Sequence, residues 1–218
     1  MKQPSPPNDY VLHHAIQGIF PIPIYFVKRD SDLDLTEKKE IEDIIKEGMD
    51  RSYGNSSTNN AYIFNNGKLK KIKQFIEQQL KIYVEQVIRP KQKLDWYITG
   101  SWLNINKPGE HHHSHYHPNS YLSAVFYITC LPNDHIVFRN RSSGLYNNIE
   151  FPKKKSTEWN ATGISQNVIE GDLIIFPSWV SHSVNRNETK NRERISLSFN
   201  TYPIGEMGNY NDATHLKL

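Results

Sequence analysis

Two segments before Pro90 carry apolar residues three to four positions apart, as on the buried face of an α-helix. In the first segment these residues are Ile41, Ile44, Ile45 and Met49. In the second they are Ile72, Phe75, Ile76, Leu80, Tyr83 and Val84. We therefore expect one helix that starts near Thr36 and a second over Lys68 to about Ile88, which Pro90 closes.

From Leu94 onward, short runs of Trp, Tyr, Ile, Val and Phe alternate with turn-forming residues. Upstream, residues 18–28 are also apolar, but Pro21 and Pro23 interrupt them, so we expect an edge strand there. A series of short strands at this spacing is typical of an all-β sandwich or jelly roll. The strands expected after Leu94 lie near residues 95–106, 121–129, 135–139, 147–151, 165–169, 173–176, 180–185 and 193–202.

These elements predict a mainly β protein with two N-terminal helices packed on one face of a β-core. We expect residues 1–15 to be a flexible arm and residues 16–218 to form one domain, because 218 residues suit a single β domain with an embellishment. The domain divides into a helical N-terminal part (16–92), a β-core (93–202) and a C-terminal tail (203–218).

Composition narrows the class of protein. Hydrophobic residues make up 37% of the chain, which is enough to build a core. The 26 Lys and Arg exceed the 23 Asp and Glu by only three, so nucleic acid is not an expected partner. One Cys excludes an internal disulfide framework and a zinc site built from several thiolates. The chain lacks a long apolar stretch and an apolar signal core, so we expect a cytoplasmic protein without a membrane partner.

Histidine is the unusual residue, because five of the ten lie between His111 and His117. Imidazole is the commonest metal ligand in proteins, and two His at i and i+2 of a strand point to the same side. Either His113 with His115 or His115 with His117 meets this condition, so the register stays open. The alternative is an exposed His-rich loop that binds metal only adventitiously.

Two later segments supply partners for this cluster. Pro177 ends a buried run and His182 follows on the next expected strand, where it is a candidate third ligand. Further on, strand alternation places Arg194, Ser196 and Ser198 on one face. A guanidinium with a neighbouring hydroxyl suits a carboxylate, because Arg grips carboxylates bidentately. The alternative for Arg194 is a structural ion pair with an internal Asp or Glu.

Taken in order, these motifs resemble the Fe(II)- and 2-oxoglutarate-dependent oxygenases, and most closely a bacterial and phage branch of that family. The resemblance covers roughly residues 95–202, and Phe-Pro-Ile-Pro at 20–23 also fits the branch. The motifs that carry it are Trp102-Leu103-Asn104, His115-Tyr116-His117-Pro118, Ser123-Ala124-Val125-Phe126-Tyr127, Phe176-Pro177-Ser178 with His182, and Arg194-Ile195-Ser196 with Phe199-Asn200.

The resemblance implies a double-stranded β-helix, with a jelly-roll or cupin-like core, and an iron dioxygenase. It implies that His115, His117 and His182 hold Fe(II), that 2-oxoglutarate chelates the metal and that its far carboxylate meets Arg194 and Ser196. Asn104 and Tyr127 complete the co-substrate pocket in this interpretation. With O2, such an enzyme hydroxylates a substrate and releases succinate and CO2; the substrate is an unidentified organic molecule or protein.

The sequence departs from the wider superfamily at one ligand. The usual site has two His and one carboxylate, whereas His117 stands where the carboxylate is expected. Glu110 and Asp172 are the alternative sources of a carboxylate. Three neutral His leave an Fe(II) centre at +2, which dianionic 2-oxoglutarate neutralises.

Two other classes of protein compete with this interpretation. One is a cupin-like metalloenzyme that does not use 2-oxoglutarate. The other is a non-catalytic β-sandwich binding module with an incidental His-rich loop. Cys130 lies on an expected core strand and is interpreted as core filler, not as a nucleophile. The Pro-interrupted edge at residues 20–27 offers a surface for a homodimer.

Overall fold

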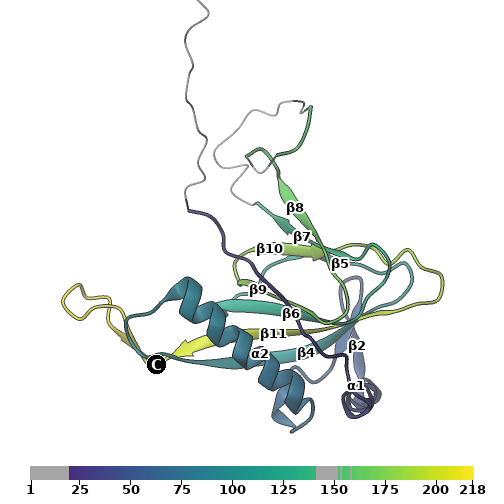
Figure 1. Ribbon diagram of the computed structural model, residues 1–218, viewed down its shortest axis with the longest axis horizontal. Helices are drawn as coiled ribbons and strands as arrows, with labels where there is room; N and C mark the ends of the chain where they lie inside the picture. Colours follow the sequence, from purple (N-terminus) through teal and green to yellow (C-terminus); the bar gives the residue numbers. More distant parts are fainter. Residues whose placement is uncertain (1–19, 141–151, 153, 158) are drawn as a thin grey trace, which may run out of the picture.

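The computed structural model describes residues 20–140, 152, 154–157 and 159–218. Two antiparallel sheets lie one over the other (Figure 1). The large sheet has the order β1-β9-β6-β11-β4-β3-β2, and the small sheet the order β5-β10-β7-β8. The strands of the large sheet are β1 (Tyr25–Lys28), β2 (Met49–Arg51), β3 (Ser56–Thr58), β4 (Asp95–Asn106), β6 (Leu122–Thr129), β9 (Asp172–Pro177) and β11 (Arg194–Ile204). Those of the small sheet are β5 (His112–His115), β7 (His135–Arg139), β8 (Gly163–Asn167) and β10 (Ser181–Val184).

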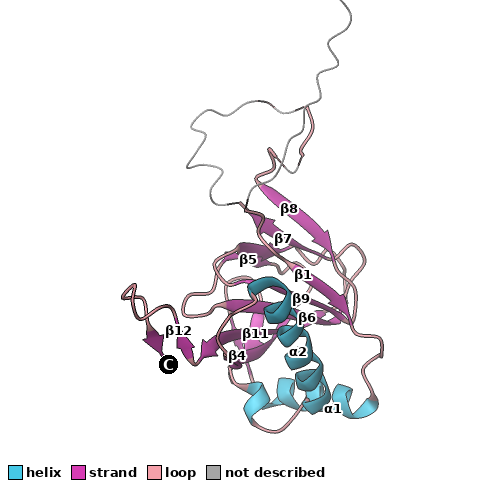
Figure 2. Cartoon of the chain, turned by 60° about the vertical axis from the view of Figure 1, so that its left-hand side comes forward, coloured by secondary structure: helices cyan, strands magenta, loops and turns pink. Residues whose placement is uncertain are grey.

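Two helices cover the outer face of the large sheet, α1 (Leu35–Glu47) and α2 (Lys70–Tyr83), as Figure 2 shows. A short 3₁₀ turn (Ile63–Asn65) precedes α2, and a π-helical turn (Val84–Ile88) follows it. Asp34 caps α1 in a capping box, in which its side chain accepts from the Glu37 N–H and the Glu37 carboxylate accepts from the Asp34 N–H. The expected helix start near Thr36 and both helices are confirmed, but α1 ends at Glu47, so Met49 lies in β2 and not on the apolar face of the helix.

The main hydrophobic core lies between the helices and the large sheet. Alternation along β11 sends Leu197 and Phe199 outward to this core, and both side chains are fully buried. The helices contribute Ile41, Ile44, Ile72, Ile76, Leu80 and Tyr83. The other face of β11 therefore carries Arg194, Ser196 and Ser198 into the space between the two sheets.

A smaller core fills part of that space. Its aromatic members Phe138 and Phe176 pack edge to face, with ring centroids 5.2 Å apart. The rest of the space between the sheets is lined by polar side chains, which is where the candidate site lies. The mainly β, jelly-roll fold with two helices on one face is thus confirmed.

The structure differs from the sequence-based expectations at a few elements. No strand was expected between the two helices, whereas β2 and β3 form a hairpin there that extends the large sheet next to β4. The segment beyond Ile204 contains a further strand pair, β12 (Glu206–Met207) with β13 (Leu216–Lys217). The expected arm 1–15 and the expected strand 147–151 lie outside the described residues.

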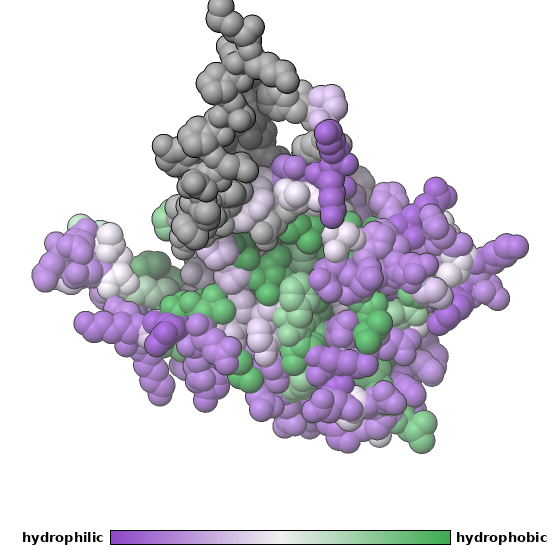
Figure 3. All heavy atoms as spheres, turned by 45° about the horizontal axis from the view of Figure 1, so that its top comes forward, coloured by the Kyte–Doolittle hydropathy of each residue, from purple (hydrophilic) through white to green (hydrophobic). Residues whose placement is uncertain are grey.

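The expected edge strand is confirmed over a shorter range, because β1 starts at Tyr25, beyond both prolines, and pairs on one side only, with β9. In the described part of the chain, no helix is long and apolar enough to span a membrane. The face drawn in Figure 3 is polar at its periphery, and apolar side chains reach the surface mainly near its middle.

Candidate active site

Three histidines from the small sheet converge in the space between the sheets. His115 and His182 are paired residues of β5 and β10, and their ring centroids lie 4.3 Å apart. His117 follows the end of β5, where its backbone N–H donates to the Ser178 carbonyl, and its ring lies 5.2 Å from that of His182. One ligand nitrogen from each of the three lies within 4.8 Å of the others. Of the two registers left open, the one with His115 and His117 is the one that meets His182.

In two of these rings, a backbone carbonyl contacts one nitrogen and leaves the other nitrogen free. The Nδ1 atom of His115 lies 2.8 Å from the His113 carbonyl oxygen, and Nδ1 of His182 lies 3.1 Å from the Val180 carbonyl oxygen. A carbonyl only accepts, so both Nδ1 atoms carry the proton and both Nε2 atoms carry a lone pair. Such backbone contacts are the usual way in which a metal-binding imidazole is held in one tautomer.

Burial keeps the three rings neutral. It lowers the pKa of His117 to about 4 and places the pKa of His182 well below its ordinary value of 6.5. Burial also lowers the pKa of His115, which the hydrogen bond to the His113 carbonyl partly offsets. Neutral imidazole is the form that binds a metal ion, so the rings are ready to act as ligands at neutral pH.

The same shifts predict how the stability of the metal-free chain depends on pH. A histidine whose folded pKa is lowered binds a proton more readily when the chain unfolds, so its contribution is present above pH 6.5 and is lost as pH falls. For His117 the loss runs from pH 6.5 down to about 4. We expect the free energy of unfolding to fall between pH 7 and 5, by at most about 1.4 kcal/mol per pH unit for each such histidine. Urea unfolding at several pH values measures it, and His117→Gln should flatten the slope; an unchanged slope in that variant contradicts the prediction.

The large sheet supplies the opposite wall of the cavity. Across β4, β11 and β6, Ser196 is the register partner of both Asn104 and Tyr127, and Arg194 is the partner of Asn106. The cavity contains about 390 Å³ of space between atoms, part of it open to solvent. The structure thus brings all seven sequence-predicted site residues to one cavity, whose lining includes His115, His117, His182, Arg194, Ser196, Asn104 and Tyr127.

Contacts with Asp134 and Asn185, together called the Arg194 clamp, hold Arg194 in this wall. Its Nη2 lies 3.0 Å from Oδ1 of Asp134, and both side chains are 1% exposed. Nη1 and Nη2 also donate to the Asn185 carbonyl at 3.0 Å each. Asp134 is itself fixed, because its Oδ2 accepts from the Leu131 N–H at 2.7 Å. The sequence left a structural ion pair as the alternative role of Arg194, and this ion pair is present. Arg194 nevertheless also lines the cavity.

Three buried donors of this wall have no hydrogen-bond partner among the described residues: Nε of Arg194, the hydroxyl of Tyr127 and Nδ2 of Asn106. Unpaired buried donors are rare and costly in native proteins. Burial also raises the pKa of Tyr127 above its ordinary value, so its hydroxyl stays a donor. Together they suit a buried ligand rich in oxygen atoms.

Asn104 differs from these donors, because its amide is used within the protein. Its Nδ2 donates to Ser198 Oγ at 2.9 Å, and its Oδ1 accepts from Asn55 at 3.3 Å. In this state Asn104 connects β4 to β11 and to Asn55, which directly precedes β3. A direct contact between Asn104 and a ligand requires one of these hydrogen bonds to break.

The two alternative carboxylates are engaged elsewhere. Glu110 forms an ion pair with Arg51 and accepts from the Lys107 N–H at 2.8 Å. Asp172 accepts from the Ile169 N–H at 2.9 Å in the turn before β9. Among the described residues, the groups able to hold a metal ion consist of histidine alone.

Three aromatic residues and Cys130 also lie around the site. The Trp102 ring lies 5.8 Å from that of His117 and lines the cavity. Trp179 is 60% exposed and Tyr116 is also exposed; neither lines the cavity. Burial raises the pKa of Cys130 to about 12, which disfavours a nucleophilic thiolate at neutral pH.

Sequence reasoning missed three residues of this region: His112, Asn106 and Asp134. Asn106 had a usable signal, since it stands two residues after Asn104 on a strand and therefore faces the same side. Asp134 had none, because it lies in the turn before β7 and reaches Arg194 only through the tertiary fold. His112 was named within the cluster but was not assigned to the cavity that it lines.

Comparison with known proteins agrees with this geometry. Residues 100–200 match the sequence model of a family described as "Putative 2OG-Fe(II) oxygenase". This region is similar to the 2OG-Fe(II) oxygenase family. The recognition of that family, its enzyme class (a 2-oxoglutarate- and Fe(II)-dependent dioxygenase) and its cofactors are confirmed at this level, with the substrate unidentified. A comparison with curated protein sequences finds no match.

Solved structures resemble the whole fold at low sequence identity. A Pseudomonas putida prolyl-4-hydroxylase is 17% identical with a TM-score of 0.54, covering 82% of this chain and 92% of its own. The non-heme alpha ketoglutarate dependent carbocyclase SnoK from nogalamycin biosynthesis is 13% identical with a TM-score of 0.58, covering 85% of this chain and 81% of its own. A 2OG-Fe(II) oxygenase family protein from Burkholderia pseudomallei is 11% identical with a TM-score of 0.52, covering 82% and 83%. At such identity the likeness establishes the fold alone.

Proposed function

We propose that His115, His117 and His182 hold Fe(II), and that the wall around Arg194 receives 2-oxoglutarate. The observation that carries this proposal is one cavity with two chemically different sides. The small sheet presents three neutral imidazoles, and the large sheet presents donors without partners. A metal ion and a dicarboxylate satisfy the two sides together.

The residues present fit both groups. Imidazole nitrogen is a good ligand for Fe(II), although three His replace the usual pair of His with a carboxylate. The unpaired Nε of Arg194 and the Tyr127 hydroxyl are suitable donors to the far carboxylate of 2-oxoglutarate. Asn106 Nδ2 offers a third donor on the same wall.

The formal charges also balance. Fe(II) at +2, Arg194 at +1 and 2-oxoglutarate at −2 would meet in the cavity, and Asp134 at −1 pairs with Arg194 without lining the cavity, so the four charges sum to zero. Without Asp134 the sum is +1, because His117 carries no charge where a carboxylate is usual. A buried net charge is costly, so Asp134 supplies the negative charge that the three-His ligand set lacks.

Each part of the cavity has a separate task in this proposal. The three imidazoles fix the metal on the side of the small sheet, and the Arg194 clamp fixes the co-substrate on the opposite side. With O2, the bound iron supplies the oxidising chemistry that converts 2-oxoglutarate to succinate and CO2 and a substrate C–H bond to C–OH. The buried walls exclude water from the metal, and Trp102 covers the His117 side.

The substrate is proposed to be an organic molecule or a protein side chain that reaches this cavity from solvent. The two alternatives of another class remain distinguishable by experiment. A cupin-like metalloenzyme needs the histidines but not the donors around Arg194. A binding module needs neither.

The decisive experiment is an anaerobic Fe(II) titration of the metal-free chain with and without 2-oxoglutarate. We expect a weak visible charge-transfer band that requires both components, because only a chelating 2-oxoglutarate on iron produces it. Iron binding without the band contradicts the co-substrate assignment and favours the cupin-like alternative. No iron binding contradicts the metal assignment and favours the binding module. Aerobic release of succinate then serves as the readout for a substrate search.

A further inference from the structure

A bulge in β5 turns an additional histidine toward the inner cluster. His182 and Val184 are two positions apart on β10, whereas their partners His115 and His112 are three positions apart on β5. The extra residue on β5 is a β-bulge, which shifts the side-chain alternation by one position. In an unbroken strand His112 would face away from His115, but here the two rings stack at 4.3 Å and 22°.

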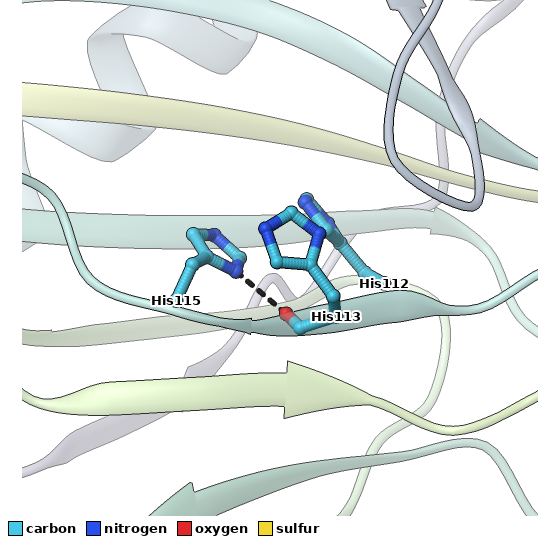
Figure 4. Close-up of side chains that lie close together, drawn as sticks. All are labelled: His112, His113 and His115. Carbon is cyan, nitrogen blue, oxygen red and sulfur yellow. Dashed lines mark hydrogen bonds between the residues drawn. The ribbon is translucent and has the colours of Figure 1, made fainter.

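His113 joins the same group. It lies two residues before His115, and the centroids of these two rings are 5.1 Å apart. Figure 4 shows His112, His113 and His115 gathered on one side of the chain. One ligand nitrogen from each of the three lies within 4.8 Å of the others, as in the inner group of His115, His117 and His182. The chain therefore contains two three-His groups that have His115 in common.

The free nitrogens of the outer group can reach one ion. Nδ1 of His113 lies 3.2 Å from the Tyr53 carbonyl oxygen and Nδ1 of His115 lies 2.8 Å from the His113 carbonyl oxygen, so Nε2 is the free atom of each. Nitrogens that share an ion at about 2.1 Å each stay within about 4.2 Å of one another. Binding one ion therefore requires the three rings to move closer together than the 4.8 Å seen in the structure.

We propose that His112, His113 and His115 form a second metal site, which binds a borderline transition-metal cation and shares the Nε2 atom of His115 with the inner site. One nitrogen lone pair holds one ion, so the two sites exclude each other. A cation in the outer site reaches the inner one by exchanging His112 and His113 for His117 and His182 while His115 stays bound. The outer group thus acts as a loading site for the proposed iron site, and this last step rests on the proposed function.

The test uses the full chain with the inner site disabled by His117→Gln and His182→Gln, and Co(II) as the probe without 2-oxoglutarate. We expect this chain to bind one Co(II), with visible absorption bands of nitrogen ligation. Adding His113→Ala should weaken that binding by more than the roughly 10–100-fold typical of removing a residue that only supports a ligand. Adding His111→Ala is the matched control, because it removes a neighbouring histidine outside the group, and it should leave binding unchanged.

Two results overturn the proposal: a folded inner-site variant that binds no Co(II), or equal effects of His111→Ala and His113→Ala, which indicate adventitious binding by a His-rich segment.

If the inner-site variant does not fold, the wild-type chain provides the test. Cobalt beyond one equivalent should compete for His115 and weaken the Fe(II)–2-oxoglutarate band, and His113→Ala should remove this competition. A band that withstands excess cobalt overturns the shared site. Failure of the proposed function is distinct, because it appears as the absence of the band before any cobalt is added.

Discussion

Replacing His182 by alanine is expected to abolish both Fe(II) binding in the inner site and turnover. His182 is 3% exposed, and its ring packs at 4.7 Å against that of Phe176 in the smaller core. Its removal leaves two ligands, and no carboxylate among the described residues stands near enough to replace it. The loss of affinity should exceed the roughly 10–100-fold typical of removing a residue that only supports a ligand. Anaerobic titration and succinate release measure the two effects.

The controls separate the loss of a ligand from the loss of folding. His182→Gln keeps most of the side-chain volume, so it should lose iron while keeping the thermal transition of the parent. His135→Ala removes a histidine of β7, in the same sheet but outside both three-His groups, and should leave the charge-transfer band unchanged. A His182→Gln chain that still forms the 2-oxoglutarate-dependent band would show that another residue holds the iron.

The sequence allowed the architecture to be predicted because its spacing is regular where the core is. The helix period over Ile72 to Leu80 and the alternation from Arg194 to Phe199 both reflect burial on one face, which is a local property. The β2–β3 hairpin was missed because its residues are polar and its strands are short. It is held in the sheet by pairing with β4, which is distant in sequence. The intrinsic β-propensity of the residues carries little information about such strands.

The site was predictable to the extent that it follows strand alternation. Strand alternation placed Arg194 and Ser196 on the same face, as in the structure, whereas their approach to His115 across the two sheets followed from the family resemblance. The orientation of His112 was not predictable, because it depends on a bulge that appears only when β5 pairs with β10. The role of Asp134 in the Arg194 clamp could not be predicted either, because a turn residue follows no sequence period.

Arg194→Lys is expected to raise the 2-oxoglutarate requirement while leaving iron in place. Lysine keeps the positive charge opposite Asp134, but it loses Nε and the forked geometry that reaches Asn185. Losing a hydrogen bond to a charged group costs about 1.5–3 kcal/mol. At about 1.4 kcal/mol per factor of ten, the KM for 2-oxoglutarate should rise roughly 10- to 150-fold. Succinate release at varied 2-oxoglutarate gives KM and kcat separately, and Fe(II) affinity is measured without the co-substrate.

Asp134→Asn tests the Arg194 clamp by changing the ion-pair partner of Arg194. It removes the negative charge that balances Arg194 and keeps one oxygen, which can accept either from Arg194 or from the Leu131 N–H, because Asp134 uses a different oxygen for each. If Asp134 positions Arg194 and neutralises the cavity, the KM for 2-oxoglutarate should change while kcat at saturation stays close to that of the parent. If the ion pair is only structural, Asp134→Asn should lower thermal stability with KM unchanged. Because breaking a buried pair from one side costs about 3–5 kcal/mol, unfolding must be measured beside the kinetics for both variants. An unaltered KM in folded Arg194→Lys would remove Arg194 from the co-substrate site.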